Sequence, residues 1–351
     1  MKVLLTGSEG YIGTVLQPLL RLAGHEVTRL DSLFFQGCAV TVSGDTSNII
    51  AKDIRDLARA DLIGYDAVVH LAGLSNDPLS ELAHQLTWDI NHRAAVFLAQ
   101  TAKEAGVSQF VFSSTCSVYG YGGEDFLTEN SPLNPLTVYA KSKLAAEQEI
   151  DTLADTGFFV THLRHGTAYG ASPMTRFDLV VNNFVAWSNA TGKVHLKSAG
   201  NAWRPLVHVE DIGRSFVAAL NPVRAQTTKR VFNIGITADN MRIIDLAEIV
   251  AEEMSASVEF GPGAEPDNRS YRVSADNALR HLPGFDPQWS VRAGIREIAQ
   301  QISDNGFSVD DVEGARLGRI AHLKWLLKEG RLGPNLRWPA AKEKASLLES
   351  S

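Results

Sequence analysis

The chain has 351 residues, 44% of them hydrophobic, which is enough apolar material for a sizeable core and for more than one domain. The formal net charge of −7 argues against a continuous surface for nucleic acid or anionic lipid, although a local basic pocket for a phosphate is compatible with it. The two cysteines, Cys38 and Cys116, are too few for a disulfide framework and fit a reducing cytoplasm. The first residues lead straight into a strand without the features of a signal peptide, and no run of about 18 apolar residues predicts a membrane span.

The first half of the chain alternates short apolar runs with helical patterns. Strands are expected at residues 2–7, 26–31, 66–73, 109–115 and 159–164. Helices that end near a glycine are expected at residues 13–24, 86–106 and 137–157. Alternation of strand and helix predicts a parallel sheet covered on both faces, so the expected fold is an α/β, Rossmann-type doubly wound sheet.

After residue 171 the alternation becomes less regular, and a smaller α/β lobe that interleaves with the first is expected. A helix is expected at 177–191, strands at 193–200 and 230–235, a strand, turn and helix across 204–220, and a loop at 261–275. The predicted organisation is a first domain at 1–171 to which 205–236 returns, a smaller lobe at 172–310, and a C-terminal helical extension and tail at 311–351. Residues 315–330 form a basic amphipathic pattern, which favours a helix packed on the body of the protein over a membrane or partner helix.

Three glycines lie in the sequence TGSEGYIG, between the first strand and the first helix. Gly7, Gly10 and Gly13 let the backbone turn tightly and approach a pyrophosphate, which the N-terminus of the helix attracts. The spacing is G-x-x-G-x-x-G rather than the G-x-G-x-x-G of many dehydrogenases. Its position between a strand and a helix supports the prediction of a dinucleotide-binding loop.

Asp31 ends the second predicted strand, eighteen residues after Gly13. A carboxylate there is expected to bind both hydroxyls of an adenosine ribose and to repel a 2′-phosphate, which predicts NAD rather than NADP. The alternative is that Asp31 only caps a loop. Asp53 and Ile54, in the sequence KDIRD, are candidates to line the adenine.

Tyr139 and Lys143 lie four residues apart in YAKSK and therefore share one face of the predicted helix. An ammonium close to a phenol stabilises the phenolate and lowers the pKa of the tyrosine. Such a tyrosine is able to exchange a proton with a sugar or alcohol hydroxyl while hydride moves to or from a nicotinamide. Alone, a Tyr–Lys pair on a helix is common by chance.

Together these features resemble the extended short-chain dehydrogenase/reductase superfamily, in its nucleotide-sugar epimerase/dehydratase branch. The resemblance covers roughly residues 1–300 and is specific because the motifs occur in order. They are TGSEGYIG with Asp31, DIRD, VVHLAG, Asn91 after LTWDI, SSTCSVYG, YAKSK, LRHGTAYG and RPLVHVEDI.

The resemblance implies a role for each matching residue. Tyr139 is the acid/base, Lys143 binds the nicotinamide ribose and tunes Tyr139, and Thr115 hydrogen-bonds the reacting oxygen. The first domain then binds NAD, and the smaller lobe binds a nucleotide-diphosphate sugar. The further cofactor contacts expected in the matching motifs are Tyr11, Ile12, Leu71, Ala72, Gly73, Ser113 and His165.

Substrate contacts are expected on several segments. Arg204 matches the position from which the family grips the nucleotide diphosphate, and Arg269 is a second phosphate candidate. Either Asn182 or Asn183 matches a substrate-contacting asparagine of the family, and the sequence does not decide between the two. After HLAG, the sequence LSNDP differs from that of many relatives, which makes Ser75 and Asn76 further candidates for substrate contacts. The alternative is a loop that is stabilised by its own polar side chains before Pro78.

The residues after Thr115 bear on the type of reaction. In the family, sugar 4,6-dehydratases carry Asp-Glu there, because elimination needs an acid for the leaving hydroxyl and a base for the C5 proton. Here Cys116 and Ser117 take those places, and neither is a ready base, since a thiol ordinarily has a pKa near ~8.5 and a serine hydroxyl far higher. A 4-epimerase needs only removal of hydride, rotation of the keto sugar and return of hydride, so small neutral residues suffice, with Cys116 and Ser117 against the substrate.

The expected function is therefore that of a cytoplasmic NAD-dependent nucleotide-sugar 4-epimerase. The alternatives are a dehydratase, decarboxylase or ketosugar reductase on the same scaffold, and a binding protein without activity. A thiolate role for Cys116 is a further alternative to its role as a neutral wall residue. The resemblance also implies a homodimer that pairs through the helix carrying Tyr139 and the helix near residues 92–106.

Overall fold

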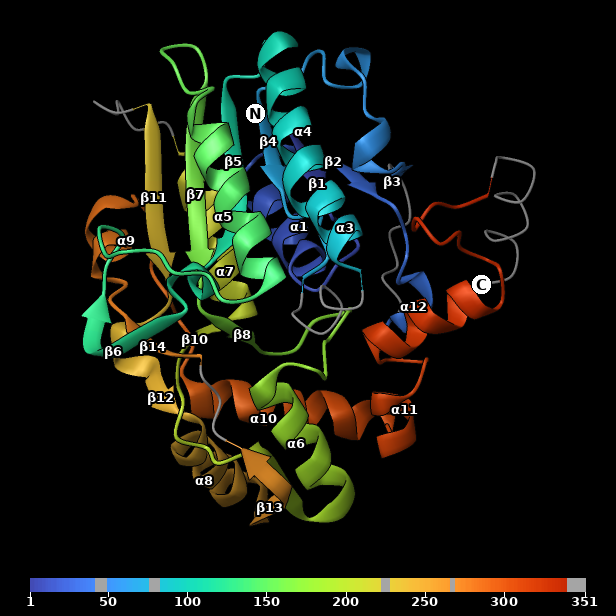
Figure 1. Ribbon diagram of the computed structural model, residues 1–351, viewed down its shortest axis with the longest axis vertical. Coiled ribbons are helices and arrows are strands. Elements are labelled where there is room, and N and C mark those ends of the chain that lie inside the picture. Colours follow the sequence, from blue (N-terminus) through green and yellow to red (C-terminus); the bar gives the residue numbers. More distant parts are fainter. Residues whose placement is uncertain (42–48, 76–82, 222–227, 266–268, 340–351) are drawn as a thin grey trace.

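The computed structural model describes residues 1–41, 49–75, 83–221, 228–265 and 269–339. A central sheet carries helices on both faces, and a smaller group of helices and short strands lies beyond the carboxyl ends of the central strands (Figure 1).

The central sheet has seven parallel strands in the order β11-β7-β5-β4-β1-β2-β3. Its strands are β1 (Lys2–Thr6), β2 (Glu26–Asp31), β3 (Ile49–Ala51), β4 (Ala67–His70), β5 (Gln109–Thr115), β7 (Phe159–His165) and β11 (Lys229–Ile234). The chain runs outward from β1 to β3 and then returns to β4 on the other side of β1. Ligands of open α/β sheets bind in the crevice that such a reversal opens, outside the carboxyl ends of the strands.

Alternate residues of each strand face opposite layers of helices, which is why these strands are apolar throughout. Leu4 of β1 belongs to the core under α4 and α5, together with Val68 and Phe110. Val3 and Leu5 belong to the core under α1 and α7. The helices of the two layers are α4 (Ala94–Glu104) and α5 (Val138–Asp151) on one face, and α1 (Gly13–Leu22) and α7 (Val209–Leu220) on the other. This is the doubly wound α/β sheet that the sequence predicts.

The smaller lobe has a core of its own, to which Phe184, Leu196, Leu246 and Ile298 belong. Its helices are α6 (Val180–Thr191), α8 (Ile243–Met254) and α10 (Val291–Asn305). Short strands pair within it or join it to the sheet domain: β13 (Ser257–Glu265) with β9 (Lys193–Ser198), β14 (Ser270–Val273) with β6 (Tyr121–Leu127), and β10 (Trp203–His208) between β12 (Asn240–Arg242) and β8 (Thr167–Tyr169). The prediction of a loop at 261–275 is wrong in part, because β14 and the end of β13 lie within it.

Three further helices are short: α3 (His84–Thr87), α9 (Asp276–His281) and α11 (Val309–Glu313). A π-helical turn at Trp88–Arg93 joins α3 to α4 and carries Asn91. Within the described ranges, no helix combines the length and apolar composition that a membrane crossing requires.

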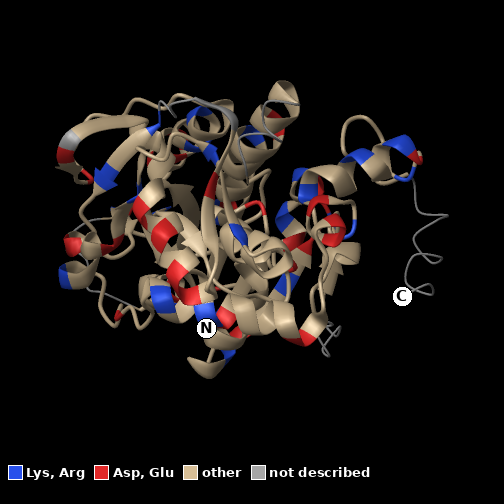
Figure 2. Cartoon of the chain, turned by 90° about the horizontal axis from the view of Figure 1, so that it is seen from below, with Lys and Arg blue, Asp and Glu red and all other residues tan. Residues whose placement is uncertain are grey.

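The predicted C-terminal helix is present as α12 (Arg319–Lys328), within a segment marked by several Lys and Arg residues (Figure 2). Leu323, Leu326, Leu332 and Leu336 of this segment are buried in the core shared with α4 and α5. The segment is therefore packed on the sheet domain, as predicted. In Figure 1, α12 lies near the carboxyl-terminal side of β2 and β3.

Candidate active site

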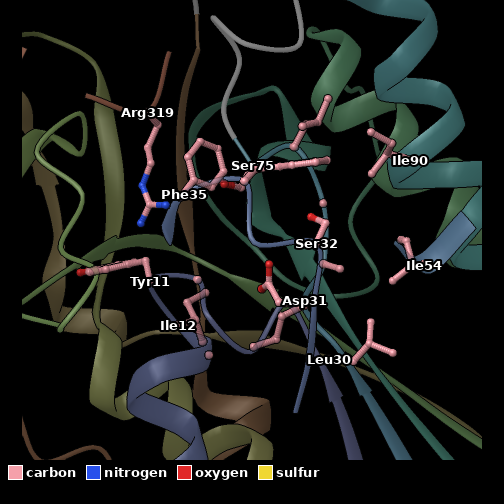
Figure 3. Close-up of a pocket in the computed structure, with 18 of the residues that line it drawn as sticks. Tyr11, Ile12, Leu30, Asp31, Ser32, Phe35, Ile54, Ser75, Ile90 and Arg319 are labelled. Carbon is pink, nitrogen blue, oxygen red and sulfur yellow. The ribbon is translucent and has the colours of Figure 1, made fainter. Parts of the chain in front are cut away.

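A pocket lies at the carboxyl ends of β1, β2 and β4, at the reversal of strand order (Figure 3). It brings together residues from four separate motifs of the sequence. The predicted cofactor residues that line it are Gly7, Gly10, Tyr11, Ile12, Gly13, Asp31, Asp53, Ile54, Leu71, Ala72 and Gly73. Their individual roles stay predictions.

The glycine loop forms one side of the pocket and is closely packed. Gly7 has φ +73°, and a Cβ there would lie 2.6 Å from the backbone nitrogen of Ala72. A Cβ on Gly13 would lie 2.3 Å from the carbonyl oxygen of Gly7. Helix α1 follows with neither a side-chain cap nor an acidic residue in its first turn. The loop thus presents the N-terminus of a helix, which attracts anions, to the pocket.

Asp31 stands at the end of β2, where the sequence places a ribose-binding carboxylate. Its Oδ1 accepts a hydrogen bond from the backbone amide of Leu33 at 2.7 Å, and its Oδ2 accepts one from that of Glu9 at 3.0 Å. Burial raises the pKa of Asp31 to about 6 in spite of these two hydrogen bonds. Asp31 does cap its loop, as the alternative interpretation held, and it also lines the pocket.

Asp53 is held by an ion pair with Arg55, whose Nη2 lies 2.6 Å from Oδ2. Burial opposes ionisation, but the hydrogen bonds from Arg55 outweigh it and lower the pKa of Asp53. Ile54 is buried beside it and belongs to the core of the α4–α5 face. This corner of the pocket is therefore apolar on one side and carries an ion-paired carboxylate on the other.

Lys143 reaches from α5 to the end of β5. Its Nζ donates a hydrogen bond to the carbonyl of Ser113 at 2.9 Å and lies 4.6 Å from the centre of the Phe112 ring. Burial lowers the pKa of Lys143 to about 8, against the opposing effect of Glu147. A Cβ on Gly73 would come within 3.6 Å of Nζ, so Lys143 lies next to the pocket wall. Ser113 contributes its backbone carbonyl to this arrangement.

Tyr139 is half-buried in the first turn of α5, one turn before Lys143. Thr115, at the end of β5, accepts a hydrogen bond on Oγ1 from the backbone amide of Ser117 at 3.1 Å. His165 lies opposite Thr115 on β7. Burial lowers the pKa of His165 to about 3, so it is a neutral ring, packed against Phe216.

Cys116, a predicted substrate contact, does not line this cofactor pocket, and its role stays a prediction. Its side chain is fully buried with Val118, Tyr119 and Tyr271, and its Sγ donates to the carbonyl of Arg164 at 3.1 Å. Burial raises the pKa of the Cys116 thiol above its ordinary value, which favours the neutral thiol. The short 3₁₀ turn Cys116–Tyr119, which begins at Thr115, directs this side chain inward.

A second group of predicted substrate residues lies together around Tyr271. Ser117 Oγ is 3.4 Å from the hydroxyl of Tyr271, and the guanidinium of Arg204 lies 5.8 Å from the ring centre of Tyr271. Arg204 also donates a hydrogen bond to the carbonyl of Arg269. Ser117, Arg204 and Arg269 thus come from three distant segments to one place, although none of the three lines the pocket of Figure 3.

The side-chain amides of Asn182 and Asn183 form hydrogen bonds with backbone groups, which does not favour either residue as a substrate contact. The amide of Asn182 is fully buried: its Oδ1 accepts from the amide of Gly170 at 3.1 Å, and its Nδ2 donates to the carbonyl of Arg176 at 3.0 Å. Asn183 Nδ2 donates to the carbonyl of Phe177 at 2.9 Å. Both asparagines therefore fix the loop that precedes α6.

The loop held by Asn182 and Asn183 carries Arg176, which the sequence does not indicate as a site residue. Arg176 lines the pocket and donates through Nη1 to Ser75 Oγ at 2.9 Å, and it forms an ion pair of 2.7 Å with Asp178. Ser75 lines the pocket as well, whereas the predicted Asn76 lies outside the described residues. A second missed residue is Arg319 of α12, which also lines the pocket; the basic pattern of residues 315–330 was its only signal in the sequence.

The chain belongs to the NAD dependent epimerase/dehydratase family, whose model matches residues 3–235. It is similar to the UDP-glucose 4-epimerase of Corynebacterium glutamicum, at 29% identity over 316 residues that cover 85% of this chain and 94% of that protein. The structure of MoeE5 in complex with UDP-glucose and NAD is similar at 26% identity with a TM-score of 0.75, covering 88% of this chain and 100% of that one. DesIV, a dTDP-glucose 4,6-dehydratase from Streptomyces venezuelae with NAD and TYD bound, gives the same identity and TM-score and covers 88% of this chain and 99% of that one.

NAD is thus the cofactor, and the pocket fits it on physical grounds. The close-packed glycine loop leaves the start of α1 open to an anion such as a pyrophosphate, and the carboxylate of Asp31, which is predicted to bind the ribose, lines the same pocket. An acidic residue at this place disfavours the 2′-phosphate of NADP.

Proposed function

We propose that this protein is an NAD-dependent nucleotide-sugar 4-epimerase. The proposal is supported by the surroundings of Cys116, because that position follows Thr115 directly, where the family's dehydratases have an acid. Its thiol is buried, donates to the carbonyl of Arg164 and has a raised pKa, so it supplies neither an acid nor a base for elimination.

When bound, NAD supplies an acceptor and a donor of hydride for C4 of the sugar. Tyr139 takes the proton of the C4 hydroxyl and later returns it, while the hydroxyl of Thr115 orients the same oxygen. Lys143 supplies positive charge one helical turn from Tyr139, which favours the phenolate. The buried position of Lys143 fixes its ammonium against the carbonyl of Ser113 at 2.9 Å.

The substrate is a nucleotide-diphosphate sugar in this proposal. Arg204 carries a positive charge next to Tyr271 and Ser117, at the junction of the sheet domain and the smaller lobe. A guanidinium binds a diphosphate through paired charge-assisted hydrogen bonds. The similarity to MoeE5, whose structure holds UDP-glucose, supports the same class of substrate.

A 4,6-dehydratase is the second candidate, since DesIV is as similar as MoeE5 in identity and TM-score. One experiment distinguishes the two: incubate the protein with UDP-, dTDP- and GDP-hexoses in deuterated water and follow the products by NMR and mass spectrometry. A 4-epimerase inverts C4 and keeps the original hydrogen there. Solvent deuterium at C5 together with a 4-keto-6-deoxy product would show a dehydratase instead.

Tyr139→Phe removes the proposed acid/base with little change of shape. We expect the rate of sugar conversion to fall by about 10²- to 10⁴-fold, as is typical for loss of a general acid/base. NAD binding, measured by titration calorimetry, serves as the control and is expected to persist. Retained conversion by the variant would contradict the proposed role of Tyr139.

A further inference from the structure

The C-terminal segment 315–338 is attached to the wall of the cofactor pocket rather than to an arbitrary part of the surface. Trp338 Nε1 donates to the carbonyl of Ser32 at 2.6 Å, and the indole ring lies 6.1 Å from the ring of Phe34. His322 packs on Phe35 at 6.3 Å. Ser32, Phe34 and Phe35 all line the pocket, immediately after Asp31.

Polar contacts also attach this segment to the loop that follows β3, at another part of the pocket wall. Arg55 donates to the carbonyls of Asn335 at 2.9 Å and of Leu336 at 2.7 Å. Arg337 forms ion pairs with Asp56 and, at 3.5 Å, with Asp53 of the pocket lining. The segment therefore joins the loops that follow β2 and β3 on either side of the predicted adenosine position.

Arg319 is the residue that this segment contributes to the pocket itself. Its side chain is 6% exposed and points into the cavity, toward the loop that carries Tyr11 and Ile12 (Figure 3). Its polar contact is a hydrogen bond from Nη2 to the carbonyl of Met174 at 3.0 Å, and its guanidinium lies 4.4 Å from the ring centre of Phe35. Both of these partners are uncharged.

This guanidinium is poorly compensated for a buried charge. Within the described part of the chain, Nε of Arg319 is buried without a hydrogen-bond partner. Burial is the main cause that lowers the pKa of Arg319 to about 10; the nearby Arg176 also lowers it, whereas Cys38, Asp178 and Asp31 act in the opposite direction. Arg176, in contrast, is paired with Asp178 through two hydrogen bonds of 2.7 and 3.0 Å. A desolvated cation beside a second cation is stabilised most by an anion that enters the cavity.

We propose that Arg319 binds the pyrophosphate of NAD, from the side of the pocket opposite to the glycine loop. The N-terminus of α1 offers partial positive charge on one side, and Arg319 offers a full charge with an unpartnered Nε donor on the other. The segment 315–338 carries this arginine to the pocket and is thereby part of the cofactor site. The proposal rests on NAD as the cofactor and is independent of which sugar is converted.

The test measures ligand binding by the full-length protein without its cofactor. NAD, ADP and adenosine are titrated into wild-type protein and into Arg319→Met, a substitution of similar length without charge. We expect the affinity for NAD and ADP to fall by about 10- to 100-fold, the effect of losing charge-assisted hydrogen bonds, whereas the affinity for adenosine changes little. Equal losses for adenosine and ADP, or no loss for either, would overturn the proposal.

Arg316→Met is the matched control. Arg316 lies on the same segment but is exposed, pairs with Asp311 at 2.7 Å and does not line the pocket. Its substitution is expected to leave the affinity for all three ligands unchanged. A fall in NAD affinity equal to that of Arg319→Met would show a general effect of charge on the segment and would contradict a direct contact.

A measurement on the wild-type protein covers the case in which Arg319→Met fails to fold. Hydrogen–deuterium exchange of residues 315–338 is followed with ADP and with adenosine at saturation. ADP is expected to slow exchange in this segment, because ligand and segment stabilise each other, and adenosine is expected to do so less. Equal protection by the two ligands would contradict a contact with phosphate. Because none of these readouts uses a sugar, a failure of the proposed epimerase activity would leave them interpretable.

Discussion

The cofactor side and the substrate side of the site differ in whether their predicted residues line a cavity or lie buried in the protein. On the cofactor side, the glycine loop, Asp31 and the Leu71–Gly73 turn all line one pocket. On the substrate side, Cys116 and Asn182 are buried and bonded to backbone carbonyls. A cofactor site made largely of backbone is determined by strand ends and glycines, whereas a substrate site depends on where individual side chains point. Four variants are designed to break or sharpen this comparison.

The largest effect is expected for Gly7→Ala. A side chain at φ +73° costs about 1–2 kcal/mol, and overpacking against Ala72, 2.6 Å from the new Cβ, adds about 1–3 kcal/mol. Thermal unfolding and NAD titration are both expected to show the loss. Gly24→Ala is the control, since Gly24 has φ +83° but no atom within 4 Å of a Cβ. An NAD affinity equal in the two variants would show that close approach at Gly7 does not shape the pocket.

Asn182→Ala tests whether this residue holds the loop or the substrate. The substitution leaves the buried amide of Gly170 without its partner, so the free energy of unfolding is expected to fall by about 1–3 kcal/mol. Asn183→Ala removes one hydrogen bond from a half-buried site and is expected to cost about 1 kcal/mol or less. Unchanged stability of Asn182→Ala with a raised KM for the sugar would instead favour a substrate contact.

The raised pKa of Asp31 predicts that the affinity for NAD depends on pH. Burial raises its pKa to about 6, with Glu9 also raising it and Arg319 lowering it. If the ionised carboxylate binds the ribose hydroxyls as predicted, the affinity is expected to be constant only well above pH 6, where Asp31 is fully ionised. Below that value it is expected to fall, approaching about tenfold per pH unit. In titrations from pH 5 to 8, Asp31→Asn should bind more weakly and lose this slope; a slope that persists would assign it to another group.

The smallest effect is expected for Cys116→Ala. The variant loses a hydrogen bond to the Arg164 carbonyl and a small volume of core, at a cost of about 1 kcal/mol of stability. Turnover is expected to stay close to that of the wild type, because the thiol is buried away from the pocket. Abolished turnover with intact NAD binding would revive a catalytic role for Cys116.

Much of the fold follows from local pattern, because each strand of the sheet is a short apolar run between helices that end near a glycine. The cofactor residues were predictable for the same reason: Asp31 and Ala72 are placed by the strands that precede them. The burial of the Cys116 side chain could not be predicted from residue spacing, because it follows from the 3₁₀ turn after Thr115. Arg176 and Arg319 were missed because tertiary packing alone brings their segments to the pocket.

The position of Arg319 also bears on when the cofactor site is completed during synthesis. Apart from Lys2, the strands of the sheet and the glycine loop lie within residues 3–235, the part that matches the family. Arg319 and Trp338 leave the ribosome later than any of these elements. If the sheet of a nascent chain folds before these residues emerge, its pocket still lacks Arg319, and the proposed contact with the pyrophosphate forms only after α12 has docked.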